Sequence, residues 1–309
     1  RGPGGRTATR YAGDQRFDHG APWFRFDDPR LARLVKSWTE QGVLTRHPDD
    51  DTLYIGTPRA NSLAAHLASS ITDFRTATRV QEIVAVSEGG FRLGWASGDS
   101  TGSDRFDAVI IAIPSPQALE LIGPVSPALG EAIARAEMAP RWTAMIETDR
   151  APTDTLSIPT DDPDLESIIP NAAKPGRPVI EGVSAWVVHA SEAFSGRELE
   201  SEPEAIAAAL REKFAAALAK AGIDAPVRSV NAHRWRYAFA TRAASDTLEA
   251  LAAPDLPLFA CGDWVHEMRP NYGVQGALLS GMAAAGLLLG RPGPERETIP
   301  DDFFMQFSS

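Results

Sequence analysis

The sequence predicts an α/β fold in which a parallel-sheet domain is divided along the chain by a second, mixed-sheet domain. Two short runs, residues 106–113 and 256–260, are apolar almost throughout, which is typical of parallel strands buried on both faces. An apolar helix pattern over residues 273–290 follows the second run. Residues 115–255 lie between these features and mix strand-like stretches with proline-rich loops, which indicates a separate domain.

The first part of the chain contains loops and two short helices. Residues 1–24 are expected to form a glycine-rich loop that leads into a short extended segment. Apolar residues at helical spacing predict a helix over residues 29–41, which Gly42 would end. A second short helix is expected over residues 61–70, with Asn61 as its N-terminal cap.

A hairpin precedes the first buried strand. Alternating apolar residues predict strands over residues 79–86 and 91–95, joined by a turn at residues 88–90. A second turn is expected at residues 98–102, and the buried strand over residues 106–113 follows it.

The middle region is expected to form the substrate-side domain. Residues 142–148 and 183–189 have strand-like patterns. Residues 204–221 form a clear helix, with Pro203 at its start and Gly222 at its end. Trp186 and His189 alternate on the second of these strands and are expected to have core or edge roles.

The last apolar helix carries a stripe of small residues. It follows the strand over residues 256–260 and a loop that begins with Cys261, which is expected to be a buried, unreactive residue. Its small residues lie four apart, at Gly273, Ala277, Gly281 and Ala285. Such a bare face would suit close packing against a sheet or a flat ligand. The remaining residues, 291–309, are expected to form a tail outside the core.

Composition limits the class of protein. The 309 residues carry a formal net charge of −11 and a pI near 5.1, which argues against nucleic acid and anionic membranes as partners. The single cysteine excludes an internal disulfide and fits a reducing, cytoplasmic setting. Residues 273–290 are uncharged but too short and glycine-rich to predict a membrane span. The amino-terminal residues do not have the apolar pattern of a signal peptide.

Three separated segments have residues suited to one ligand. Gly4 and Gly5 offer backbone N–H groups beside the cation of Arg6, which is what a pyrophosphate requires, although such loops are also common as plain turns. Asp263 directly follows a buried strand and can accept hydrogen bonds from sugar hydroxyls. The helix start near Gly273 presents free N–H groups and a positive dipole end. Together they predict a polyhydroxylated, partly anionic ligand at the end of the sheet.

Several motifs in order resemble one known family. They are RGPGGRTATR, FDHGAPWF, TRVQEIVAVSEGGFRL, FDAVIIAIPSPQAL, HRWRYAFAT and LFACGDWVHEMRPNYGVQGALLSGMAAA. Their order and spacing resemble the renalase-like branch of the FAD-dependent amine oxidase superfamily, over residues 1 to about 289. The resemblance implies a discontinuous FAD/NAD(P)-binding Rossmann-like domain, with FAD as cofactor and electrons passing from substrate to flavin to oxygen.

The resemblance also implies roles for individual residues. Gly4, Gly5 and Arg6 would lie along the FAD pyrophosphate, and His19, Gly20 and Ala21 near the isoalloxazine ring. Val80 would contact adenine through its backbone, and Asp263 would bind the pyrophosphate–ribityl region. Val274, Gln275, Gly276 and Ala277 would place the helix start under the pyrimidine side of the flavin.

The substrate pocket is expected to be aromatic. Its candidates are Trp235, Tyr237, Trp264, Asn271 and Tyr272, and each has core or loop packing as its alternative. The histidines have no partner carboxylates at metal-binding spacing, so no metal site is expected. No side-chain acid or base is assigned, because a free amine or an electron-rich ring can lose hydride to a flavin without one.

The predicted domains follow from these assignments. The FAD-binding domain comprises residues 1–24, 71–114 and 256–290, the substrate domain residues 25–70 and 115–255, and the tail residues 291–309. The family's first strand, G-x-G-x-x-G turn, helix and second strand are expected to be absent, since no such motif occurs in the sequence.

Two functional hypotheses therefore stay open. The first is an FAD-dependent oxidase of an amine-like or reduced-nicotinamide-like small molecule that releases hydrogen peroxide. The second is a non-catalytic or truncated relative that does not hold FAD. The expected partner is a small-molecule substrate, with no nucleic acid and no membrane, and the sequence leaves the oligomeric state open.

Overall fold

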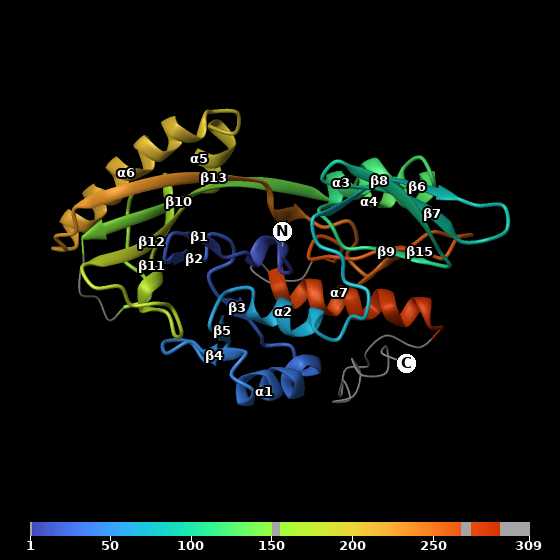
Figure 1. Ribbon diagram of the computed structural model, residues 1–309, viewed down its shortest axis with the longest axis horizontal. Helices are drawn as coiled ribbons and strands as arrows, with labels where there is room; N and C mark the ends of the chain where they lie inside the picture. The colour runs from blue at the N-terminus through green and yellow to red at the C-terminus, as the bar shows by residue number, and fades with distance from the viewer. Residues whose placement is uncertain (1, 150–154, 267–272, 291–309) are drawn as a thin grey trace.

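A computed structural model describes residues 2–149, 155–266 and 273–290 (Figure 1). Two lobes lie at the ends of the long axis, and the long strands β10 (Glu137–Asp149) and β13 (Val227–Arg242) run from one toward the other. The helix α7 (Gly273–Leu288) lies below the second lobe, next to a smaller third unit. None of the helices among the described residues is long and apolar enough to cross a membrane.

The first lobe is built on a four-stranded antiparallel sheet. Its order is β11 (Leu165–Pro170), β12 (Val183–Ala190), β10 and β13. The helices α5 (Glu192–Arg197) and α6 (Pro203–Lys220) pack on one face, where Trp142, Trp186 and Phe214 are fully buried. These elements confirm the strands expected over residues 142–148 and 183–189 and the helix that starts with proline.

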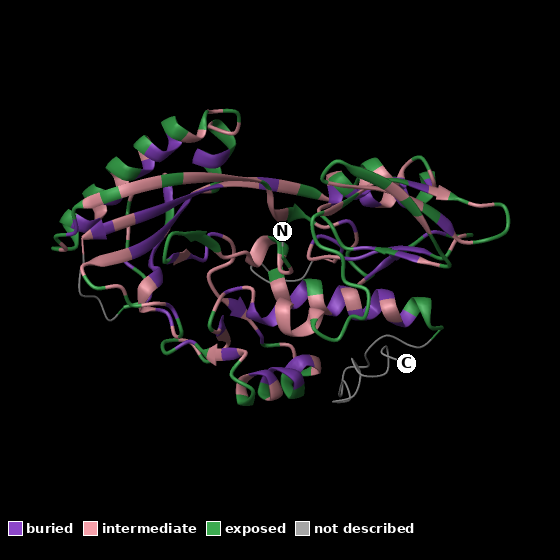
Figure 2. Cartoon of the chain, viewed as in Figure 1, coloured by how far each residue is buried: buried purple, intermediate pink, exposed green. Residues whose placement is uncertain are grey.

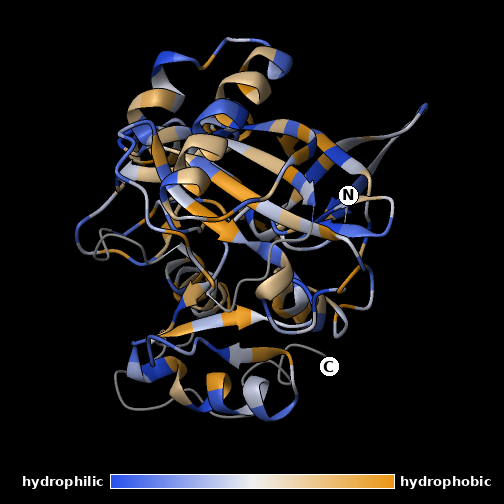
Figure 3. Cartoon of the chain, turned by 90° about the vertical axis from the view of Figure 1, so that its left-hand side faces the viewer, coloured by the Kyte–Doolittle hydropathy of each residue, from blue (hydrophilic) through white to orange (hydrophobic). Residues whose placement is uncertain are grey.

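The other face of this sheet is called the inner face below. Against it lie β2 (Gln15–Phe17) of the hairpin with β1 (Arg10–Ala12), and a small cluster that includes Phe17, Met145 and Val187. The short 3-10 helix η3 (Asn171–Ala173) follows β11. Because side chains alternate along a strand, Arg141 and Thr143 share this face with Met145. Figure 3 shows hydrophobic and hydrophilic residues alternating along these strands.

The second lobe contains the expected parallel pair. β9 (Val109–Ile111) runs parallel to β15 (Leu258–Ala260), and β14 (Leu251–Ala252) pairs antiparallel with β15. The meander of β6 (Thr78–Ala85), β7 (Phe91–Ser97) and β8 (Ser100–Phe106) and the helices α3 (Ser115–Ile122) and α4 (Pro127–Ile133) complete it. Its core contains Phe91, Leu258 and Trp264.

The third unit packs on α7. It contains the 3-10 helix η2 (Pro29–Leu31), α1 (Ala32–Glu40), α2 (Ser62–Ala68) and the sheet of β3 (Phe24–Arg25), β5 (Leu53–Gly56) and β4 (Leu44–Arg46). Its core joins Leu31 and Trp38 to Leu279 and Met282 of α7. The helix expected over residues 29–41 is therefore confirmed, with its first turn in 3-10 form.

Three local expectations were wrong. β9 forms an edge among the described strands and Ile110 is 37% exposed, so this strand is not buried on both faces. Residues 98–102 are not all turn, because β8 begins at Ser100 and pairs with β7. Asn61 is the N-cap residue of α2 as expected, but the capping hydrogen bond expected of its side chain is not formed, and its amide N–H donates to the carbonyl of Pro3 at 3.2 Å.

The small-residue stripe of α7 does not have the first of its two expected roles, packing against a sheet, and the second, facing a flat ligand, stays a prediction. Gly273 and Ala277 are exposed, and Gly281 and Ala285 are half-buried. The buried side of the helix instead carries Gln275, Gly276, Leu279, Ser280, Met282, Ala283, Ala284 and Gly286. Figure 2 shows buried and half-buried positions alternating along α7 and its exposed C-terminal end. Within the described residues, the stripe is not the face that packs on a sheet.

Candidate functional site

Arg6 joins three segments that are far apart in the sequence. Its guanidinium donates to both carboxylate oxygens of Asp263, at 2.6 and 2.9 Å, and to the carbonyl oxygen of Ala238 in β13 at 3.0 Å. Such two-pronged pairs between a guanidinium and a carboxylate are among the stronger hydrogen bonds in proteins. The structure thus brings the two predicted cofactor residues Arg6 and Asp263 together, and their charges compensate each other.

The glycines around Arg6 allow close approach of two backbones. The N–H of Ala21 donates to the carbonyl of Arg6 at 2.9 Å, and a Cβ on Gly20 would lie only 1.9 Å from that oxygen. Gly4 has φ +118° and a Cβ there would lie 2.8 Å from the Cβ of Asn61. Only glycine fits Gly20 and Gly4 without displacing a neighbour. The short helix η1 (Gly5–Thr7) starts at Gly5.

The start of α7 is tied to the same region by buried side chains. The fully buried amide of Gln275 accepts hydrogen bonds from the N–H groups of Asp27 and Asp28, both at 2.9 Å. Ser280 accepts from the N–H of Gly262 at 3.0 Å, next to Asp263. Gln275 is one of the residues on this helix that were expected to bind the cofactor. Its side chain instead connects the helix to the backbone at Asp27 and Asp28. Val274 packs in the same cluster as Ala21, Gly276 is buried and Ala277 is exposed.

His19 lies in a cluster of rings. Its centroid is 5.0 Å from that of Trp235 and 4.9 Å from that of His233, and the Trp235 indole donates to the His19 carbonyl at 2.9 Å. Burial and the neighbouring His233 lower the pKa of His19 to about 4, so the ring is neutral at pH 7. His19 is 6% exposed, and its Nδ1 has no hydrogen-bond partner among the described residues.

A row of polar residues crosses the inner face at one register. Thr143 of β10 is paired with His189 of β12 and with His233 of β13, and His189 is paired with Ser167 of β11. The Ser167 hydroxyl lies 3.1 Å from Nδ1 of His189. Burial, followed by the charges of Arg141 and Lys174, lowers the pKa of His189 to about 3. Thr143 and Arg141 were not predicted as site residues, although their alternation with the apolar residues of β10 could have placed them on one face.

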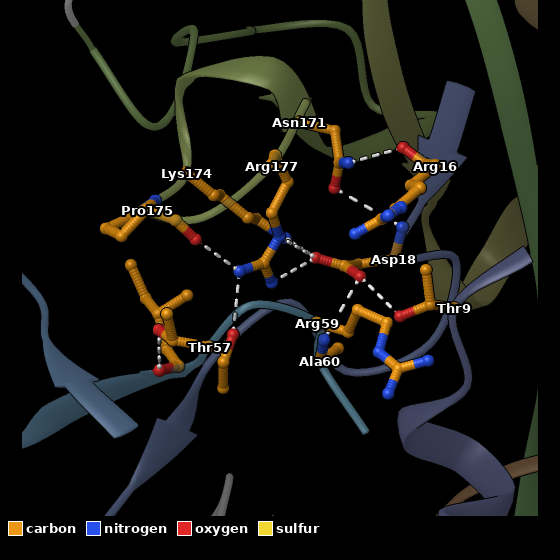
Figure 4. A network of polar contacts seen from close by, with 12 residues as sticks. Thr9, Arg16, Asp18, Thr57, Arg59, Ala60, Asn171, Lys174, Pro175 and Arg177 are labelled. Atoms are coloured by element: carbon orange, nitrogen blue, oxygen red, sulfur yellow. Dashed lines mark hydrogen bonds and ion pairs between the residues drawn. The ribbon is translucent and has the colours of Figure 1, made fainter. Parts of the chain in front are cut away.

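A buried charge cluster fixes the segment that leads to His19 (Figure 4). Asp18 is fully buried between Arg177, whose Nε lies 3.0 Å from its carboxylate, and Lys174, whose Nζ lies at 3.3 Å. The same carboxylate accepts hydrogen bonds from the hydroxyl of Thr9 at 2.7 Å and from the N–H of Ala60 at 3.2 Å. Burial alone would raise the pKa of Asp18, but the two cations lower it to about 2. Burial lowers the pKa of Lys174 to about 8.

The remaining predicted residues are scattered. Tyr237 is half-buried where the β10–β13 register is irregular, near the Arg6 contact with Ala238. Val80 lies at an irregularity in β6, an edge strand of its sheet. Trp264 does not line a pocket, because it is fully buried in the core and its indole donates to the Ile113 carbonyl at 3.0 Å. Asn271 and Tyr272 lie outside the described residues.

A cavity of about 640 Å³ opens elsewhere, between η2, α7 and the loop before β14. Its lining includes Arg30, which is paired with Asp28 and Glu249, together with His266 and Leu287. None of the predicted site residues that the structure describes lines it. Cys261 is buried, which raises the pKa of its thiol to about 11 and excludes a reactive thiolate at pH 7.

Comparison with known proteins gives a consistent assignment. Residues 44–289 match the family described as flavin containing amine oxidoreductase. The fold is similar to that of cyclohexylamine oxidase from Brevibacterium oxydans IH-35A, with 14% sequence identity and a TM-score of 0.50, over 84% of this chain and 58% of that one.

Two other solved structures are similar with lower TM-scores. The flavin-dependent halogenase CmlS is 16% identical with a TM-score of 0.46, over 84% of this chain and 48% of that one. OxyS anhydrotetracycline hydroxylase from Streptomyces rimosus is 13% identical with a TM-score of 0.40, over 84% of this chain and 47% of that one. The chain thus spans about half the length of the solved structures that it matches.

Proposed function

The chain belongs to the flavin-containing amine oxidoreductase family, and we propose that it is an FAD-dependent oxidase of a small molecule. The substrate would be amine-like or reduced-nicotinamide-like, and oxygen would take up the electrons as hydrogen peroxide. The observation that carries the proposal is that two distant segments meet at Arg6, whose guanidinium pairs with Asp263 and whose backbone carbonyl accepts from the N–H of Ala21. These segments are separated by up to 257 positions in the sequence.

The residues at this convergence fit an FAD. Backbone can approach a ligand closely at Gly5 and Gly273, because a Cβ at either position would have no neighbour within 4 Å among the described residues. The start of α7, where Gly273 is exposed, supplies N–H groups that have no partner within the helix and the positive end of the helix dipole. Gly4, Gly5 and Arg6 would hold the pyrophosphate, Asp263 the ribityl hydroxyls, and Val274–Ala277 the pyrimidine edge.

FAD, when bound, supplies the acceptor for the hydride of the substrate. The chain's own part is to bind and orient the substrate and to exclude water. Trp235 offers a flat aromatic surface, which its hydrogen bond to the His19 carbonyl holds in place. His19 stays neutral at pH 7 because of its low pKa, so its ring adds no charge beside the substrate. We assign no general base, because a free amine loses hydride without one.

Absorbance of the purified chain tests the proposal. We expect flavin bands in the visible spectrum after FAD is added and unbound FAD is removed by gel filtration. Asp263→Ala should lower the retained flavin at least fivefold, because Arg6 loses its partner and the ribityl ligand is removed. The control is Asp161→Ala, which removes an exposed ion pair with Lys220 and should leave retention unchanged.

The same experiment decides between the two hypotheses. A folded chain that retains no flavin at any FAD concentration would support the non-catalytic relative instead. Equal flavin retention by the Asp263→Ala variant and the unaltered chain would contradict the role assigned to Asp263. Peroxide formation with an amine or a reduced nicotinamide, measured on the flavin-loaded chain, then separates the two substrate types.

A further inference from the structure

We propose that the inner face of the β10–β13 sheet binds a carboxylate, with Arg141 and Thr143 as its direct ligands. The inference deepens the proposed function and rests on it in one respect, namely that the carboxylate belongs to the substrate of the oxidase. It assigns a chemical class to that substrate: a small molecule that carries an anionic carboxylate beside the group to be oxidised.

Unpaired polar atoms gather on this face. Nε of Arg141, Oγ1 of Thr143 and Nδ1 of His19 are all buried and have no hydrogen-bond partner among the described residues. Arg141 and Thr143 are two positions apart on β10, and Thr143 is paired with His233, whose ring lies 4.9 Å from that of His19. Leaving a buried polar group unpaired is costly, so these three neighbouring atoms point to a ligand-binding site.

Arg141 has a weak partner for its charge. Its contact with a carboxylate is a long one, 3.4 Å to Glu166, whose side chain is half exposed. The charges of Arg141 and Lys174 both act on the buried His189 in the polar row of this face. A mostly buried guanidinium with so long a contact to its carboxylate is stabilised by a second anion.

The donors favour a carboxylate over other anions. A guanidinium whose Nε–H has no partner among the described residues and a neighbouring hydroxyl match the two oxygens of a carboxylate. The guanidinium of Arg141 lies over the ring of Phe239 at 4.8 Å, and this contact fixes its plane. Trp235, which is paired with Arg141 across the strands, adds an aromatic wall. The site is therefore suited to a small aromatic or apolar molecule with one carboxylate.

Calorimetric titration of the full chain, with and without added FAD, tests the inference. The probes are benzoate and benzamide, which have nearly the same shape and differ in charge. We expect benzoate to bind saturably and at least tenfold more tightly than benzamide. Arg141→Met should weaken benzoate binding at least tenfold, because the charge is lost while the length of the side chain is nearly kept. Thr143→Val, which keeps the shape, should weaken it about threefold by removing one hydrogen bond.

The control variant is Arg228→Met, which removes an exposed arginine near the start of β13 that pairs with Asp149 and should bind benzoate normally. Circular dichroism checks the fold of each variant, and Thr143→Val keeps the test valid if Arg141→Met does not fold. Equal binding of benzoate and benzamide, absent benzoate binding, or unaltered binding by both variants would overturn the inference. Benzoate binding without flavin retention would overturn the oxidase but leave the carboxylate site standing.

Discussion

Two buried histidines link the stability of the protein to pH. The folded-state pKa values are about 4 for His19 and about 3 for His189, well below the ordinary value near 6.5, chiefly because burial disfavours the charged rings. Below pH 6.5 the unfolded chain therefore takes up protons that the folded chain does not bind. Stability is then lost as the pH falls, until each folded-state pKa is reached.

We predict that the free energy of unfolding decreases between pH 6.5 and pH 4, by about 1.4 kcal/mol per pH unit for each histidine. His189→Gln should roughly halve that slope, because one of the two linked protons is removed. Urea unfolding at pH 7, 6 and 5 measures the slope, and equal slopes for the variant and the unaltered chain would contradict the prediction. The contribution of Asp18 is separate, since its depressed pKa makes stability fall only below about pH 4.

At the scale of elements, Gly20 decides how two segments cross. The backbone at Gly20 and Ala21 passes directly over Arg6, and the N–H of Ala21 donates to the Arg6 carbonyl at 2.9 Å. This crossing places His19 against Trp235 and keeps Arg6 aimed at Asp263. Any side chain at position 20 must push the two backbones apart, because the nearest obstacle is the carbonyl of Arg6 and not a flexible side chain.

We predict that Gly20→Ala destabilises the fold by about 2–4 kcal/mol and lowers flavin retention with it, as expected for overpacking at a close backbone contact. Gly196→Ala is the matched control, because that glycine lies in α5 with no atom within 4 Å of the added Cβ. The control should be neutral or slightly stabilising, by about 0.5–1 kcal/mol. Thermal unfolding of both variants checks this, and similar melting temperatures would show that the crossing tolerates a side chain.

For the whole molecule, the Asp18 cluster holds three regions together. Asp18 follows the β1–β2 hairpin, Ala60 belongs to the loop between β5 and α2, and Lys174 and Arg177 follow η3. Arg177 also donates to the carbonyl of Gly56 at 2.7 Å. The cluster therefore connects the sheet of the first lobe to the third unit, and through Asp18 it fixes the position of His19 (Figure 4).

We predict that Asp18→Asn costs about 3–5 kcal/mol, because two buried cations lose their only shared carboxylate among the described residues. Adding Lys174→Met to this variant should recover part of the loss, since one of the uncompensated charges is removed. Denaturant unfolding of the two single variants and the double variant forms a thermodynamic cycle. Strict additivity of the two changes would show that Asp18 and Lys174 do not interact.

The sequence by itself determined much of the local structure. The helix α6, with proline at its start, and the strands β6, β10 and β12 follow from periodicity and capping, which depend on neighbours in the chain. The order of the motifs also indicated a flavin amine oxidase relative, and the match of residues 44–289 confirms that superfamily. Asn61 lies at the N-cap position, but its amide N–H donates to the distant carbonyl of Pro3 and its Oδ1 makes no capping hydrogen bond.

Only the tertiary structure decided which residues meet. Arg6 and Asp263 were both expected near a cofactor, but their pairing required the chain to return over 257 positions. Trp264 was expected in a pocket but lies in the core, where its indole N–H donates a hydrogen bond to the carbonyl of Ile113 on a separate segment. The row of Thr143, His189 and His233 exists only through the register of three strands. Local sequence patterns determine where helices and strands form. Strand register, burial and charge balance depend instead on contacts between segments that are distant in the sequence, and local patterns do not show which of these segments meet.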